Sequence, residues 1–140
     1  MITINYAHLC EKAFLSQNGN LNLIGIFERI SSPKFPLSFP QLSIVTSLTG
    51  DPGEHQLMIK IINKKDQSEI TKDITLNITI QNPENQSNPQ AQNLRIIGDI
   101  NNISLQEIGE YEVKIFLNRH QAYAIPFSVE KVKQPIPEGR

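Results

Sequence analysis

Apolar side chains recur at every second position in residues 109–117, which read Gly-Glu-Tyr-Glu-Val-Lys-Ile-Phe-Leu. The odd-numbered positions from 111 to 117 are apolar, and Glu110, Glu112 and Lys114 occupy the even-numbered positions up to 114. Successive side chains of a β-strand point to opposite faces. The pattern therefore predicts a strand with one buried face and one face in water.

Tyr111 opens this strand two residues after Gly109. An aromatic residue in this position is typical of the tyrosine corner of immunoglobulin-like domains, where the phenol hydrogen-bonds a backbone group upstream. We therefore assign structural roles to Tyr111 and Gly109. The ring should be buried, and its hydroxyl should meet a backbone group in the segment before Gly109.

Further alternating segments predict the rest of a β fold. Asn18-Gly19 between apolar runs predicts a hairpin, because both residues tolerate positive φ. Residues 74–80 alternate without a fault, which predicts a strand with one apolar face. The predicted strands besides that of Tyr111 cover residues 3–16, 21–30, 42–48, 56–63, 74–80, 94–103 and 123–132.

Proline and glycine modify this series at three places. Three prolines within residues 31–40 predict a crossover between sheets, because proline lacks the amide donor of a central strand. Gly98 predicts a bulge or bend in its strand. Pro126 lies inside the last strand, so one side of that strand should be an unpaired edge.

These segments predict an all-β fold, a two-sheet antiparallel β-sandwich of the immunoglobulin-like kind. No strand alternates with a helix, which argues against parallel α/β folds. We expect one domain over residues 1–132 and a disordered tail at 133–140. Residues 82–93 are almost wholly polar, and we expect a mobile loop there.

Composition narrows the function by exclusion. In 140 residues, 13 Lys and Arg oppose 14 Asp and Glu, so the net charge of -1 favours neither nucleic acid nor an anionic membrane. A basic leader and a long apolar segment are both missing from the sequence, and we expect a cytoplasmic protein. Cys10 is the single cysteine, which excludes an internal disulfide and a cysteine-based zinc site.

Cys10 and His8 would point to the same strand face, so a thiolate–imidazole pair is conceivable. Such neighbours lie roughly 7 Å apart, beyond hydrogen-bond reach. A free cysteine is also among the most buried residue types. We therefore favour a structural Cys10 without a reactive thiol.

The remaining residues give little indication of a metal site or of a catalytic acid–base pair. The histidines are His8, His55 and His120, which would have to converge from different loops to bind zinc. Asp51, Glu54 and Asp66 lie near turns but lack the spacing of a calcium loop. Glu110 and Glu112 share a face, which is more often a solvated strand face than an acid–base pair. We expect no catalytic residue, no metal and no cofactor.

Other site types are equally weak in this sequence. No Gly-x-Ser-x-Gly elbow and no glycine-rich phosphate loop is present. Tyr6, Phe116 and Tyr123 could form a small aromatic patch for stacking a ligand, although packing between strands is the more common use of such residues.

Several short motifs resemble one family. They read Tyr-Ala-His-Leu-Cys-Glu-Lys-Ala at 6–13, Asn-Gly-Asn-Leu-Asn-Leu-Ile-Gly-Ile-Phe-Glu-Arg-Ile at 18–30, Gly-Asp-Pro-Gly-Glu-His at 50–55 and Gly-Glu-Tyr at 109–111. Together they resemble a bacterial family of small single-domain β-sandwich proteins of unknown function. The resemblance implies a stand-alone bacterial protein and no particular activity.

Two functions stay open at this point. The first is a non-enzymatic interaction module that recognises another protein through loops or an exposed edge strand. The second is a small-ligand-binding or enzyme accessory domain, with a pocket near His55 and the proline-rich crossover. The edge expected at Pro126, the loosening expected at Gly98 and the low net charge also suggest a weak homodimer.

Overall fold

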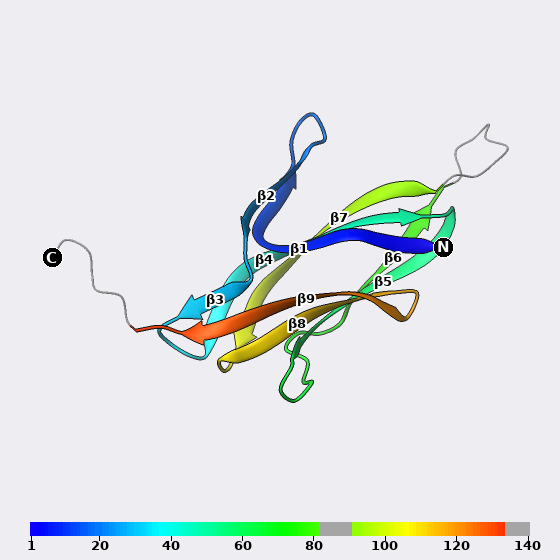
Figure 1. Ribbon diagram of the computed structural model, residues 1–140. Coiled ribbons are helices and arrows are strands. Elements are labelled where there is room, and N and C mark those ends of the chain that lie inside the picture. The colour runs from blue at the N-terminus through cyan, green and yellow to red at the C-terminus, as the bar shows by residue number, and fades with distance from the viewer. Residues whose placement is uncertain (82–90, 134–140) are drawn as a thin grey trace.

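The computed structural model describes residues 1–81 and 91–133. Within them, nine strands form two sheets, which confirms the all-β prediction (Figure 1). The predicted tail lies outside the described residues from 134 on. The predicted loop over 82–93 lies outside them at 82–90, and it is wrong at 92 and 93, which belong to a strand. The strands are β1 (Ile2–Leu15), β2 (Leu21–Ile26), β3 (Arg29–Ser32), β4 (Leu37–Gly50), β5 (Gly53–Asn63), β6 (Ile74–Ile80), β7 (Gln92–Leu105), β8 (Gly109–Leu117) and β9 (His120–Lys131).

The first sheet has the order β2-β1-β4-β7, and all its pairs are antiparallel. The second has the order β3-β9-β8-β5-β6 and is mixed, because β3 runs parallel to β9. The prediction of two purely antiparallel sheets is therefore wrong for the second sheet. Alternation along a strand reports which face is buried, but it does not report the direction of a neighbouring strand.

The inner faces of the two sheets share one hydrophobic core. Leu9, Ile44 and Ile100 contribute to it from the first sheet, and Ile61 and Ile115 from the second. Ile61 and Ile115 lie on strands whose apolar residues recur at every second position, so one face of each strand is removed from water. On the second sheet, the alternation in the sequence thus leads directly to this core.

The predicted strand at 21–30 is two strands that belong to different sheets. β2 ends at Ile26 and β3 begins at Arg29. At the break, the Phe27 amide donates to the carbonyl oxygen of Leu9 in the first sheet (3.1 Å). The Ser128 amide donates to the carbonyl oxygen of Glu28 from the second sheet (2.9 Å). Phe27 and Glu28 therefore carry the chain from one sheet to the other.

Two predictions about sheet irregularities are wrong. The proline-rich segment is not wholly a crossover, because β4 already begins at Leu37 and includes Pro40. β1 pairs with β4 only from Ser43 onward, so the missing amide donor of Pro40 can face a side without a neighbour. Gly98 makes no bulge, since it pairs in register with Ile44.

The edge expected at Pro126 is present. β8 pairs with β9 on one side, and Pro126 lies opposite Glu112 in that register. On the other side, β3 covers β9 only from Ser128 to Lys131. Among the described strands, none pairs with the other side of β9 at Pro126. This free edge of β9 faces the place where the chain changes sheets.

Candidate functional site

Tyr111 is buried near the start of β8. Its side chain is 1% exposed, and its hydroxyl donates to the Glu107 carbonyl oxygen at 2.7 Å. The ring stacks on Phe127 with 5.5 Å between the centroids. Burial raises the pKa of the hydroxyl, while the hydrogen bond to Glu107 acts in the opposite direction. The hydrogen bond predicted upstream of Gly109 is thus present, and Gly109 has a φ of 149° that favours glycine.

Cys10 lies in a second, smaller apolar cluster with Ala13 and Val45 and is fully buried. Its thiol lies 3.4 Å from the Lys12 carbonyl oxygen and 3.7 Å from that of Ser43, so both can accept its proton. Burial raises the pKa of the thiol, which disfavours the thiolate that a nucleophile requires. This environment supports the structural role of Cys10.

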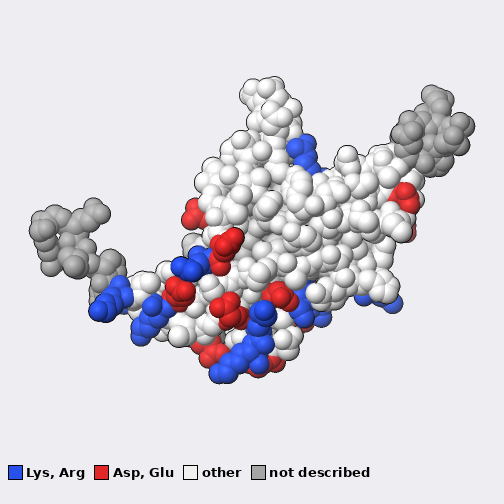
Figure 2. Space-filling model, in the orientation of Figure 1, with Lys and Arg blue, Asp and Glu red and all other residues white. Residues whose placement is uncertain are grey.

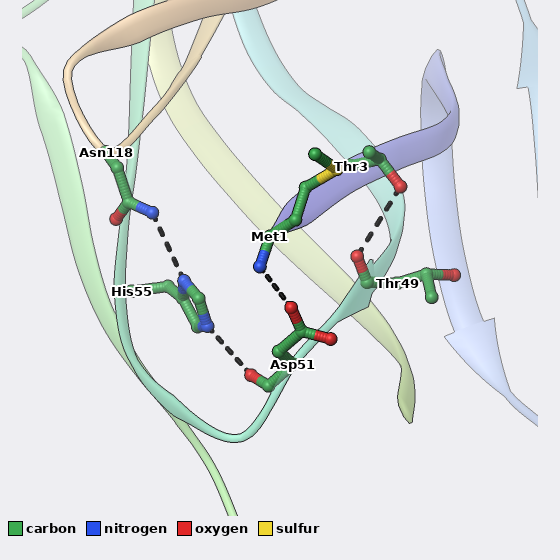
Figure 3. Close-up of polar contacts among 6 residues, drawn as sticks. All are labelled: Met1, Thr3, Thr49, Asp51, His55 and Asn118. Carbon is green, nitrogen blue, oxygen red and sulfur yellow. Dashed lines mark hydrogen bonds and ion pairs between the residues drawn. The ribbon is translucent and has the colours of Figure 1, made fainter. Parts of the chain in front are cut away.

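His55 is the third residue of β5, close to the turn that follows β4 (Figure 3). Its Nε2 donates to the Asp51 carbonyl oxygen (2.9 Å), and its Nδ1 accepts from the amide nitrogen of Asn118 (3.2 Å). The Asp51 carboxylate forms an ion pair with the amino group of Met1. Both ring nitrogens are therefore engaged in holding the turn between β4 and β5 against the β8–β9 turn.

A cavity of about 360 Å³ lies beside this turn, lined by Glu54, His55, Gln56, Asn77, Ile78, Thr79 and Asn118. The sequence had placed a pocket near both His55 and the proline-rich crossover. That placement is wrong, because the two lie at opposite ends of the 14-residue strand β4. Cavity and crossover therefore cannot form one site.

The other candidate residues are dispersed. Asp66 accepts hydrogen bonds from Ser68, which lower the pKa of its carboxyl. The Glu112 carboxylate lies 4.0 Å from Lys64 Nζ. Over residues 1–81 and 91–133, no group of three or more His, Cys, Asp or Glu side chains could hold a metal ion.

The suggested aromatic patch is not formed. Tyr6 packs against the cluster of Cys10 on the first sheet, with its ring 5.4 Å from that of His8. Phe116 lies on the second sheet, where Lys60 Nζ is 5.9 Å from its ring centroid. Tyr123 also belongs to the second sheet, where it lies opposite Ile115, while Phe116 lies opposite Gln121. None of the ring pairs among the described residues joins two of these three side chains.

The sequence did not reveal an exposed apolar surface on the β1–β2 hairpin, which projects from the body of the molecule (Figure 1). Phe14, Ile24 and Ile26 are 41%, 50% and 59% exposed, and we call them the apolar stripe. Phe14 lies opposite Asn22 and Ile24 opposite Lys12, so Phe14 and Ile24 share one face of the hairpin. Ile26 follows beyond the left-handed Gly25. β2 contains no charged residue, and Figure 2 shows the hairpin uncharged toward its tip.

The opposite face of the hairpin is turned to the first sheet. Leu21 and Leu23 pack against the cluster of Cys10 and Val45. At the hairpin tip, the Gly19 carbonyl oxygen accepts a hydrogen bond from Arg95 of β7 (2.8 Å). These contacts hold the hairpin in place while the apolar stripe faces water.

The apolar stripe continues into a groove of about 400 Å³ between the sheets. Ile26 belongs to both stripe and groove, and Phe27 and Pro126 also line the groove. Glu28 and Glu110 also line it, and neither carboxylate forms an ion pair within the described part of the chain. The full lining is Ala7, His8, Leu9, Ile26, Phe27, Glu28, Glu110, Ile125, Pro126, Phe127 and Ser128.

One signal in the sequence could have identified this surface. Residues 21–26 are apolar on both faces of the strand, with Leu21 and Leu23 on one side and Ile24 and Ile26 on the other. A strand at the edge of a sheet cannot bury both faces. The surplus apolar face is the stripe.

Comparison with known proteins identifies a family but no activity. A model described as a family of unknown function (DUF6941) matches residues 5–130. No curated protein matches the chain. No helix among the residues that the structure describes is long and apolar enough to cross a membrane.

Proposed function

The chain belongs to the DUF6941 family of unknown function, and we propose that it is a non-enzymatic protein-interaction module. The docking surface in this proposal consists of the apolar stripe and the adjoining groove. Its occupant is an extended segment of another protein that carries apolar and basic side chains. The observation that supports the proposal most is the continuity of stripe and groove through Ile26.

Exposure of the stripe is unfavourable unless a partner covers it. Burying one large apolar side chain contributes about 1.5–3 kcal/mol. Singly exposed apolar residues are common on protein surfaces, but contiguous ones mark interaction sites. Phe14 and Ile24 lie diagonally across the hairpin, with Asn22 and Lys12 opposite them, and Ile26 follows Ile24 in the uncharged strand β2.

Charge indicates which side chains the partner contributes. Glu28 and Glu110 place two carboxylates in the groove without a cationic neighbour in ion-pair distance among the described residues. A Lys or Arg of the partner would pair with them there, and the electrostatic attraction would speed association at low salt. Arg29, the nearest basic residue along the chain, is already paired with Glu130 at 3.3 Å.

Gly25 influences the mode of docking. It adopts a φ of 68° one residue before the end of the edge strand β2, and the Glu11 side chain packs closely over it. Such a left-handed residue twists an edge strand and limits long strand addition. We therefore assign most of the affinity to side-chain contacts with the stripe and the groove, rather than to a long new hydrogen-bonded ladder.

The immunoglobulin-like sandwich also stays part of the proposal. Support comes from the core shared by both sheets and from the Tyr111 hydrogen bond to Glu107. In such sandwiches, recognition is carried by loops and edges placed on a rigid framework. The projecting hairpin would be an element of this kind.

Selection of peptides from a random phage library tests the proposal. Peptides enriched on the wild-type chain should combine apolar residues with Lys or Arg. Replacing Ile24 and Ile26 by serine together should weaken their binding at least tenfold, because two anchors lose their apolar surface. The control is Leu76→Ser, which removes an exposed apolar side chain from β6 of the other sheet.

Equal binding of the selected peptides to the Ile24→Ser/Ile26→Ser variant would contradict the proposal.

A second candidate function, small-ligand binding, is favoured by the size of the groove, which falls within the range of ligand pockets. Fragment screening by NMR separates the two. Fragments that bind the groove equally well in an Ile24→Ser variant, which leaves the groove lining intact, would favour the small-ligand function.

A further inference from the structure

The two sheets end in four edge strands, and three of these are protected. β7 carries Arg95 and Asp99 and contains Asn102 with a φ of 56°. β2 contains the left-handed Gly25, and β3 has only four residues. Charge, irregular backbone and shortness all discourage pairing with a second chain.

β6 is the exception among the edges. Its seven residues, Ile-Thr-Leu-Asn-Ile-Thr-Ile, include no charge, no proline and no glycine. It pairs with β5 from Gly53 to Ile59 without a register shift, and no strand of the described residues pairs with its outer side. Segments of this composition and length associate readily when they lie at an edge.

The sequence of β6 is nearly the same in both directions about Asn77. Ile74 mirrors Ile80, Thr75 mirrors Thr79, and Leu76 mirrors Ile78. An antiparallel pair of two identical strands, centred on Asn77, would therefore bring like residues opposite one another. Thr–Thr and apolar cross-strand pairs stabilise antiparallel sheets.

We propose that β6 pairs with β6 of a second copy of this chain, antiparallel about a twofold axis at Asn77. The pairing extends the five-stranded sheet across the axis. Leu76, which is 38% exposed, then packs against Ile78 of the other copy. β6 carries no like charges that would meet across the axis, so the strand does not repel its own copy.

This dimer differs from the one that the sequence suggested. Pro126 borders the groove and Gly98 pairs in register with Ile44, whereas the edge proposed for self-pairing is β6. One strand per copy is a small contact beside the ~1,600 Å² of a standard interface, and we expect weak association, with a dissociation constant of roughly 100 μM. The proposal uses a different surface from the docking groove and is independent of it.

Disulfide trapping tests the register directly. Directly opposed residues of an antiparallel pair have Cα atoms about 4.5–5.5 Å apart, which a disulfide can bridge. Oxidation of an Asn77→Cys variant should therefore give a cross-linked dimer. Thr75→Cys is the matched control, because residue 75 of one copy lies roughly 13 Å from residue 75 of the other. The wild-type chain, with its buried Cys10, should not cross-link.

Sedimentation velocity over a concentration series gives a second readout. Asn77→Lys should abolish association by placing two like charges at the axis, and Asn101→Lys on β7 should leave it unchanged. A wild-type chain that stays monomeric at millimolar concentration would overturn the proposal. Equal cross-linking at positions 75 and 77 would also overturn it, and this outcome does not depend on whether Asn77→Lys folds.

Discussion

Strands β8 and β2 use apolar residues in two different ways. β8 lies between β5 and β9, and its apolar face, with Val113 and Ile115, is fully buried in the main core. β2 lies at the edge of the other sheet, and Ile24 and Ile26 remain half exposed or more. The comparison shows that an apolar face belongs to the core only where the topology supplies a second layer. The same face at an edge is a surface for contact.

The largest predicted effect is the difference between β8 and β2 in how much an alanine substitution lowers the free energy of unfolding. Ile115→Ala should lower the free energy of unfolding by about 2–5 kcal/mol, because it leaves a cavity in the core. Ile24→Ala should change it by less than about 0.5 kcal/mol, since its side chain is half exposed. Urea unfolding of both variants measures the contrast. Similar losses would show that Ile24 belongs to the core.

Tyr111→Phe should have a smaller effect within β8. It removes the hydrogen bond to Glu107 but keeps the ring against Phe127. We expect a loss of about 0.5–1.5 kcal/mol, the net contribution of one hydrogen bond. Tyr123→Phe is the control, because Tyr123 is exposed. If both variants lose the same amount in urea unfolding, the Tyr111 hydroxyl has no special role.

The smallest effect concerns alkaline pH. Burial holds the pKa of Tyr111 above its ordinary value of 10.0 in the folded chain. Above that value the unfolded chain has released the proton and the folded chain still binds it, so the free energy of unfolding falls as pH rises. This stabilisation is complete below pH 10.0 and is lost as pH rises through the folded pKa. Urea midpoints should therefore fall more steeply in the wild type than in Tyr111→Phe. Parallel curves would contradict this assignment.

Much of the fold follows from local patterns in the sequence. The hairpin at Asn18-Gly19, the strand at 74–80 and the Tyr111 hydrogen bond all depend on neighbouring residues, and each is present in the structure. The free edge at Pro126 follows in the same way, because the missing amide donor is a property of that residue alone.

What could not be predicted depends on contacts between distant segments. No local signal shows that Phe27 and Glu28 carry the chain to the other sheet, because their hydrogen bonds join them to Leu9 and Ser128. Pro40 is accepted within β4 because β1 does not reach it. The groove could not be predicted either, since residues far apart in the sequence line it.

The account depends most on the claim that the apolar stripe and the groove form one docking surface. Amide chemical-shift mapping tests it directly, with a peptide selected on the wild-type chain titrated into labelled protein. We expect the shifts to cluster at residues 24–28 and 125–128, which border the groove and the stripe. Shifts concentrated around His55 and Asn118, at the other cavity, would contradict the claim.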